Sequence, residues 1–373
     1  MNKKIRVLIV DDSSIVRTLL TKLLSADPGI EVVGTAPDPY FARDKLIELK
    51  PDVMTLDIEM PRMDGVTFLE KVMQHFPVRT IIISSLSLKG SELALRALEA
   101  GAVDVMTKPA IDVSQSLLAL GEEIRQRVKV AANVNLDRLI ERKNNVRPAE
   151  TSTVKAQSSA VRALGQLPSH VTGQALSRTT HQILAIASST GGTEALKELL
   201  PKLPSDLPGT VIVQHMPPVF TKTFADSLQK ICPFEVKEAE NGDRVIPGRA
   251  LLAPGNFHME LTRSGAFYYV RLHQEPSLHG VRPAADYLMK SVAKVAGNNA
   301  IGVVLTGMGK DGAEGLLSMK QAGSYNIAQD ENSCVVFGMP KVAIDLGAIH
   351  IVSPLNKISA LLFEQFRVRM GAA

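Results

Sequence analysis

The sequence predicts two α/β domains, each built on a mostly parallel sheet, joined by a linker. The chain has 373 residues, more than one ordinary hydrophobic core accommodates. Strand-like apolar runs alternate with helix-like segments in both halves, and a polar stretch without sustained periodicity separates them. Because parallel strands need crossover connections, this alternation predicts parallel sheets with helices on both faces.

The composition is that of an ordinary globular protein, with 45% hydrophobic residues, 21% charged residues and a formal net charge of +4. Nothing in it calls for a nucleic-acid partner or membrane insertion. No stretch approaches the ~20 apolar residues that span a bilayer, and the first apolar run stops at Asp11, too early for a signal peptide. Cys232 and Cys334 lie far apart without metal-ligand spacing, so we expect a reducing, cytoplasmic location.

The first domain is predicted over residues 1–125, where five strand-like runs alternate with helix-like segments. The expected strands are Ile5–Val10, Glu31–Thr35, Val53–Leu56, Thr80–Ser84 and Val103–Met106. The expected helices are Ser14–Ser25, Pro39–Leu49, Val66–His75, Ser91–Ala100 and, less sharply bounded, Val113–Val130. Five units of this kind predict an open parallel sheet.

A linker is predicted over residues 126–179, since residues 133–178 are rich in Ser, Thr, Asn, Gln, Pro and Arg. The second domain is then expected over residues 180–373. Its expected strands include Gln182–Ala187, Thr210–Val213 and Ala300–Thr306, and its expected helices include Gly192–Leu200 and Ala313–Gln321. Short β-like pieces between residues 236 and 270 predict a mixed sheet with a parallel centre.

Ligands of open parallel sheets bind outside the carboxyl ends of the strands. At that edge of the first predicted sheet, the sequence places a cluster of polar residues. Asp11 and Asp12 follow the first strand, Asp57 ends the third, Ser84 ends the fourth and Lys108 follows the fifth. Three carboxylates at one edge favour a hard divalent cation such as Mg2+. Asp57 could then attack phosphorus, while the hydroxyl and the ammonium contact the phosphoryl group. Taken singly, each residue is better explained as a helix cap, a turn residue or a surface charge, and it is their joint placement at one edge that favours a phosphoryl site.

The segment Leu56–Gly65 (LDIEMPRMDG) and the Lys108-Pro109 pair resemble the response-regulator receiver family. The resemblance covers residues 1 to about 125 and implies a flavodoxin-like (βα)5 fold and a histidine kinase as phosphodonor. By position, it implies phosphorylation at Asp57, Mg2+ ligands at Asp11, Asp12 and Asp57, and phosphoryl contacts from Ser84 and Lys108. Many receivers carry a switch aromatic three residues before the lysine; Val105 stands there, so no aromatic rotamer change is expected.

A second candidate site begins at the turn Ser188–Thr193 (SSTGGT), between an expected strand and an expected helix. Such a turn could cradle an anion on free backbone N–H groups or present a nucleophilic hydroxyl beside them. It could also simply cap the helix. His215 and Asp311 follow two further strands of the same domain, so a hydroxyl, a base and an orienting carboxylate would meet. Their order along the chain differs from that of α/β-hydrolases.

The loop Gly307–Gly312 (GMGKDG) also matches the dinucleotide-binding fingerprint, with Asp330 about 20 residues further on. A dinucleotide-dependent enzyme is therefore one alternative. It would place the Asp311 carboxylate beside a pyrophosphate and leave Ser189 and His215 without a role, so we favour a hydrolase. A DNA-binding output domain is a second alternative, although no helix-turn-helix or basic recognition helix is evident.

Six segments of the second domain resemble the chemotaxis protein-glutamate methylesterase (CheB) family. They are Ala185–Thr193, Gln214–Pro217, Leu252–Gly255, Leu305–Ala313 and the pair Ala328–Glu331 with Cys334–Pro340. The resemblance spans roughly residues 180 to 370, and the order receiver, linker, esterase is that of the family.

The resemblance implies a cofactor-independent serine hydrolase with Ser189 as nucleophile, His215 as base and Asp311 as orienting carboxylate. The substrates implied are glutamate γ-methyl esters of chemoreceptors, with glutamine deamidation as a second activity. We expect the Met308 N–H in the oxyanion hole, and phosphorylation to uncover the Ser189 site. One departure is Val281, where the family pattern leads us to expect histidine.

Overall fold

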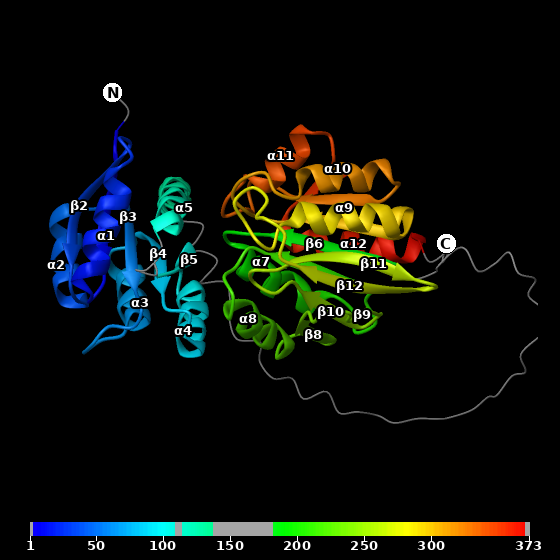
Figure 1. The fold of residues 1–373 in the computed structure, drawn as a ribbon, viewed down its shortest axis with the longest axis horizontal. Helices are drawn as coiled ribbons and strands as arrows, with labels where there is room; N and C mark the ends of the chain where they lie inside the picture. The colour runs from blue at the N-terminus through cyan, green and yellow to red at the C-terminus, as the bar shows by residue number, and fades with distance from the viewer. Residues whose placement is uncertain (1–2, 109–113, 137–181, 370–373) are drawn as a thin grey trace, which may run out of the picture.

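The structure is a computed structural model that describes residues 3–108, 114–136 and 182–369 (Figure 1). Two α/β units lie side by side, residues 3–136 forming one and residues 182–369 the other. The fold class predicted from the sequence is confirmed. Among the described residues, no helix is both long and apolar enough to cross a membrane.

The first unit is a five-stranded parallel sheet in the order β2-β1-β3-β4-β5. Its strands are β1 (Ile5–Val10), β2 (Ile30–Ala36), β3 (Val53–Asp57), β4 (Arg79–Ser84) and β5 (Asp104–Thr107). Its helices are α1 (Ser14–Ser25), α2 (Pro39–Leu49), α3 (Gly65–His75), α4 (Leu88–Glu99) and α5 (Ser114–Ala132). α1 and α5 cover one face of the sheet, and α2, α3 and α4 cover the other.

Side-chain caps set the starts of four of these helices. Ser13, Asp38, Asp64 and Ser87 each accept a hydrogen bond from a backbone N–H of the first turn. Because Ser87 caps α4, that helix starts at Leu88 rather than at the expected Ser91. α5 extends past residue 125, the expected domain end, and most of the expected linker 126–179 lies outside the described residues.

The second unit is built on a seven-stranded sheet whose neighbouring strands are all parallel, in the order β15-β14-β13-β6-β7-β10-β8. Its strands are β6 (Ile183–Ser188), β7 (Gly209–Gln214), β8 (Glu235–Glu238), β10 (Arg249–Leu252), β13 (Ala300–Val304), β14 (Tyr325–Gln329) and β15 (Ile351–Ser353). β9 (Arg244–Val245), β11 (His258–Ser264) and β12 (Phe267–His273) form a separate antiparallel sheet. The expected parallel centre is confirmed, but the mixed sheet is wrong in one respect, since the antiparallel strands form a sheet of their own.

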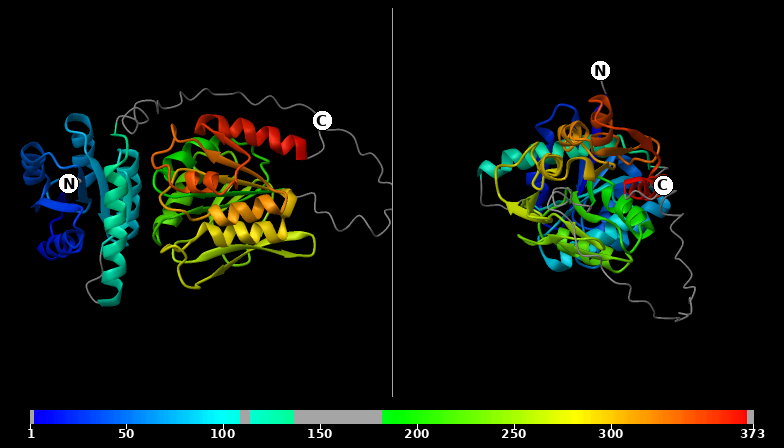
Figure 2. Two further views of the ribbon diagram at one scale, coloured as in Figure 1. Left: turned by 90° about the horizontal axis from the view of Figure 1, so that it is seen from above. Right: turned by 90° about the vertical axis from the view of Figure 1, so that its right-hand side faces the viewer.

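Helices cover both faces of this main sheet (Figure 2). β6 is buried along its whole length and divides its side chains between two cores: Leu184 and Ile186 face one, and Ile183, Ala185 and Ala187 the other. α7 (Gly192–Leu199), α8 (Phe220–Gln229) and α12 (Leu355–Arg369) line the first core. α9 (Ala285–Val295), α10 (Ala313–Gln321), α11 (Met339–Asp345) and the small sheet line the second.

The two units contact each other through α4 and β5 of the first. Ser91 Oγ on α4 lies 2.7 Å from Thr223 Oγ1 on α8, and Lys197 on α7 pairs with Glu99 at 2.5 Å. Val335 and Val336 of the second unit pack against the α1/α5 cluster of the first. The first unit therefore lies against the strand-end side of the second, where the esterase residues were predicted.

Candidate functional site

The acidic edge of the first unit is assembled as the sequence predicts. Lys108 Nζ lies 2.7 Å from Asp57 Oδ2 and 3.2 Å from Asp11 Oδ2. Carboxylate oxygens of Asp11, Asp12 and Asp57 all lie within 4.8 Å of one another. Asp11 and Asp57 are buried and Asp12 is exposed. The arrangement brings three carboxylates and an ammonium group together at the ends of β1, β3 and β5.

Burial shifts the pKa values of the carboxyl groups in this cluster. It raises the pKa of Asp57 above its ordinary value. The hydrogen bond and the charge of Lys108 oppose this shift, and repulsion from Asp11 adds to it. Burial raises the pKa of Asp11 in the same way. A divalent cation would relieve this cost, because it supplies the positive charge that a single ammonium cannot. Three carboxylate oxygens at this spacing fit the hard oxygen ligands that Mg2+ prefers.

Ser84 ends β4 at the same edge, but its hydroxyl lies against α4. Its Oγ is 3.4 Å from the carbonyl oxygen of Gly90 and 3.5 Å from that of Ser85, and the side chain is buried. Val105, at the position of the expected aromatic, is buried in β5. The hydroxyl is therefore directed toward the helix that contacts the second unit.

The turn that carries Ser189 joins β6 to α7 in the middle of the second sheet. The chain runs from β6 to β7 on one side and returns later as β13 on the other side, so the strand order reverses at β6, the position at which ligands of open parallel sheets bind. Ser189 N donates to the carbonyl oxygen of Thr306 at 3.0 Å, which ties this turn to the segment after β13. A Cβ on Gly307 would lie 2.8 Å from Ser189 Cβ and 2.3 Å from Met339 Sδ. Only glycine therefore permits this close approach of the Gly307–Gly312 loop to Ser189.

His215 and Asp311 meet at this edge of the sheet. His215 Nε2 lies 2.7 Å from Asp311 Oδ2, and both side chains are buried. The carboxylate also accepts from the N–H groups of Ala285 at 2.5 Å and Asp286 at 3.0 Å. Burial alone would raise the pKa of Asp311, but His215 and these two N–H groups outweigh it and hold the pKa below its ordinary value. Asp311 is thus kept ionised and aimed at the imidazole.

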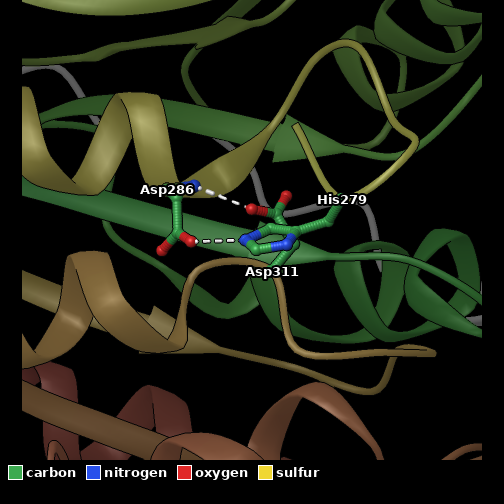
Figure 3. A group of neighbouring side chains, drawn as sticks. All are labelled: His279, Asp286 and Asp311. Atoms are coloured by element: carbon green, nitrogen blue, oxygen red, sulfur yellow. Dashed lines mark hydrogen bonds and ion pairs between the residues drawn. The ribbon is translucent and has the colours of Figure 1, made fainter. Parts of the chain in front are cut away.

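Asp286 and His279 lie beside Asp311, and the sequence did not indicate a role for them (Figure 3). His279 Nε2 lies 2.9 Å from Asp286 Oδ2, and Asp286 Oδ1 accepts from the N–H of Gly315 at 2.7 Å. The start of α10 is therefore capped by a protein carboxylate, which disfavours a pyrophosphate there. The signal in the sequence was an acidic residue in the first turn of a helix, which is too common to stand out.

These three side chains have ligand atoms close enough to hold a metal ion. Both oxygens of Asp311 already accept hydrogen bonds from His215 or backbone N–H groups, and a cation would have to displace these donors. We therefore assign the cluster to the positioning of Asp311.

Among the described residues, no hydrogen bond joins Ser189 Oγ to His215. Because the carboxylate of Asp311 can only accept, His215 Nε2 carries the proton, and Nδ1 is the nitrogen left to act as a base. Catalytic hydrogen bonds are often long without substrate and tighten when it binds. The N–H of Met308, in the loop next to Ser189, has no protein acceptor among the described residues.

Comparison with known proteins places this chain in a family. The CheB methylesterase model matches residues 184–362, and the response regulator receiver domain model matches residues 7–119. A "Protein-glutamate methylesterase/protein-glutamine glutaminase" of Bdellovibrio bacteriovorus is 62% identical over 372 residues, covering 100% of both chains. The chain belongs to the CheB methylesterase family. A protein of the same name from Syntrophotalea carbinolica is 49% identical and covers 98% of each chain.

Among solved structures, the CheB methylesterase catalytic domain of Thermotoga maritima matches with 42% sequence identity and a TM-score of 0.49. That match covers 49% of this chain and 98% of the other. The family matches lie on the two described units, receiver first and methylesterase second, as the resemblance in the sequence implied.

Proposed function

We propose that the chain is a phosphorylation-activated protein-glutamate methylesterase that hydrolyses glutamate γ-methyl esters on chemoreceptors. The observation that carries this proposal is the His215–Asp311 pair at the strand ends on either side of the turn that presents Ser189. The proposed domains are a receiver over residues 1–125, a linker over 126–179 and a catalytic domain over 180–373. The relatives that match over their full length carry both methylesterase and glutaminase in their names.

The proposed reaction runs through an acyl-enzyme. His215 Nδ1 takes the proton from Ser189 Oγ as that oxygen attacks the ester carbonyl carbon, and Asp311 stabilises the imidazolium that forms. The oxyanion is met by backbone N–H groups, including that of Met308. His215 returns the proton to the leaving oxygen, methanol departs, and water hydrolyses the glutamyl ester on Ser189.

Deamidation of glutamine follows the same course. The amide carbonyl forms the same tetrahedral intermediate, and ammonia leaves in place of methanol. The protonated imidazole of His215 supplies the proton that the nitrogen needs to depart. One site therefore serves both activities that the relatives' names describe.

Control of this site is proposed to come from Asp57. A histidine kinase is the proposed phosphodonor, and Asp11, Asp12 and Asp57 would hold Mg2+, which neutralises charge on the phosphoryl oxygens. Lys108 would pair with the phosphoryl group, and Ser84 would turn from Gly90 to donate to it. Because Gly90 belongs to α4, this movement would loosen the helix that contacts α8.

The receiver is proposed to inhibit the esterase by covering it. Thr190, the residue after the nucleophile, donates from Oγ1 to Asp104 Oδ2 of the receiver at 2.7 Å and is buried. A phosphoryl group adds about −1.5 to −2 charge to the receiver. Interdomain surfaces of modest area are repacked by changes of that size.

The test is methanol release from methylated chemoreceptors by the wild type, by Ser189→Ala and by a chain lacking residues 1–130. Ser189→Ala should lose nearly all activity and the truncated chain should exceed the unphosphorylated wild type. Equal release by wild type and Ser189→Ala would contradict the serine mechanism. A folded truncated chain with an unchanged or lower rate would contradict inhibition by covering.

A further inference from the structure

Gln214 ends β7 and places its amide between the backbones of the proposed nucleophile and base. Its Nε2 donates to the carbonyl oxygen of Ser189 at 2.9 Å and to that of His215 at 3.1 Å. Its Oε1 accepts from Ser188 Oγ at 2.7 Å. The side chain is only 3% exposed and Ser188 is fully buried, so water does not substitute for these bonds.

The orientation of this amide is determined by its partners. The carbonyl oxygens of Ser189 and His215 can only accept, so the nitrogen must face both of them. Oε1 then faces Ser188, whose hydroxyl donates to it. The amide nitrogen, the amide oxygen and the Ser188 hydroxyl all have partners in this one orientation, which holds the side chain rigidly.

The surrounding backbone is shaped to admit this side chain. A Cβ on Gly192 would lie 2.2 Å from Gln214 Oε1 and 2.6 Å from Ser188 Cβ, so the first residue of α7 must be glycine. Gly192 N also donates to the carbonyl oxygen of Ser189 at 2.7 Å. That carbonyl therefore receives two donors, one from the start of α7 and one from Gln214.

We propose that Gln214 is a positioning residue for catalysis: it clamps the Ser189 and His215 backbones together so that Ser189 Oγ and the imidazole keep their reactive separation. Ser188 serves the clamp by orienting the Gln214 amide. This inference rests on the proposed serine mechanism. The hydrogen bonds of Gln214 go to Ser188 Oγ and to the backbones of Ser189 and His215, so it acts through these two residues and not on the reacting atoms themselves.

The expected effect is on turnover rather than on substrate binding. A backbone hydrogen bond also joins the two strands, from His215 N to the carbonyl oxygen of Ser188 at 3.0 Å. It lies one residue before the proposed nucleophile and leaves the Ser189 carbonyl oxygen free of it. Without Gln214 the Ser189–Thr190 peptide plane loses its donor from β7. A misplacement of about 1 Å in a catalytic group costs about 100-fold in rate.

The experiment compares Gln214→Met with wild type in the full chain, treated with a small-molecule phosphodonor and supplied with methylated chemoreceptor. Methionine keeps the volume of the side chain and removes all three hydrogen bonds. We expect kcat to fall about 10- to 100-fold, with KM within about twofold of wild type.

Asn326→Leu is the matched control. Asn326 is also fully buried and also donates from its amide to two carbonyl oxygens, of Leu316 and Ala348, but these lie at the β14 and α10 side of the fold. The control should lower the melting temperature and keep kcat. A Gln214→Met protein whose kcat matches that of Asn326→Leu would overturn the proposal.

Two further variants cover the remaining cases. Ser188→Ala leaves both Gln214 donors in place, removes only the group that orients them and should lower kcat about threefold to tenfold at unchanged KM. If Gln214→Met does not fold, an unchanged kcat in Ser188→Ala is the result that contradicts the clamp. Ser189→Ala run beside them separates the two proposals, since activity in that variant would defeat the serine mechanism itself.

Discussion

Thr190 Oγ1 in the methylesterase domain donates to Asp104 Oδ2 in the receiver at 2.7 Å, and the same carboxylate oxygen pairs with Arg127 at 2.7 Å. One oxygen at the start of β5 thus contacts both Arg127 on α5 of the receiver and Thr190, the residue after the proposed nucleophile. The Asp104 carboxylate therefore links β5 and α5 of the receiver to the Ser189 turn.

The first prediction concerns the partly buried ion pair of Arg127 with Asp104. Each side chain is only 13% exposed, and Arg127→Met should destabilise the chain by about 1–3 kcal/mol, because Asp104 loses its counter-charge and keeps only the donors from Thr190 and Val105. Urea unfolding of the full chain measures the loss. Arg43→Ala, which breaks an ion pair with Asp44 on an exposed surface, should cost about 0–1 kcal/mol. Similar losses for the two variants would contradict a buried role for Arg127.

The second prediction concerns the interface made by α4. A Ser91→Ala, Glu99→Ala double variant removes the contacts with Thr223 and Lys197 without touching Ser189 or Asp57. Because these contacts favour the covered state, basal methanol release without phosphodonor should rise severalfold, and the phosphorylated rate should stay unchanged. An unaltered basal rate would show that α4 does not hold the receiver in place.

The third prediction concerns Asp311. Asp311→Asn keeps the size of the side chain but loses the charge that stabilises imidazolium, so kcat should fall about 10³- to 10⁴-fold. Methanol release at saturating methylated receptor measures this. A loss of less than tenfold would mean that His215 does not depend on this carboxylate.

The same carboxylate predicts a pH dependence of stability. The folded-state pKa of Asp311 is lowered, so its stabilisation is present above the unfolded pKa of 3.8 and is lost as pH falls through the folded value. Wild type should therefore exceed Asp311→Asn in unfolding free energy at neutral pH, and the difference should shrink below pH 3.8. A difference independent of pH would contradict this sign.

The fourth prediction concerns Asp57, whose pKa is shifted in the opposite direction. Burial raises it, so the ionised carboxylate costs stability at neutral pH, and that cost disappears as pH falls toward the unfolded pKa of 3.8. In the absence of Mg2+, Asp57→Asn should raise the melting temperature at neutral pH and abolish phosphorylation by a small-molecule donor. Added Mg2+ should stabilise wild type more than the variant, and equal stabilisation would argue against Asp57 as a ligand.

Local sequence signals were sufficient for much of the fold. α1, α2 and α10 have the predicted bounds because caps and apolar periodicity act over a few residues. The start of α4 was missed because Ser87, rather than the apolar pattern, sets it. The separation of the antiparallel sheet from the main sheet was also missed, since pairing partners of short strands are not encoded in any one of them.

For both candidate sites, the sequence alone determined only part of the arrangement. It determined which residues stand at strand ends, and therefore that Asp57 with Lys108, and Ser189 with His215 and Asp311, belong to two separate edges. That follows from the geometry of parallel sheets, in which all carboxyl ends of the strands lie on one side. Only the tertiary structure decided that Thr190 touches Asp104, that His279 and Asp286 stand behind Asp311, and that the Gln214 amide joins Ser189 to His215. These contacts join segments distant in the chain, and packing rather than local pattern brings them together.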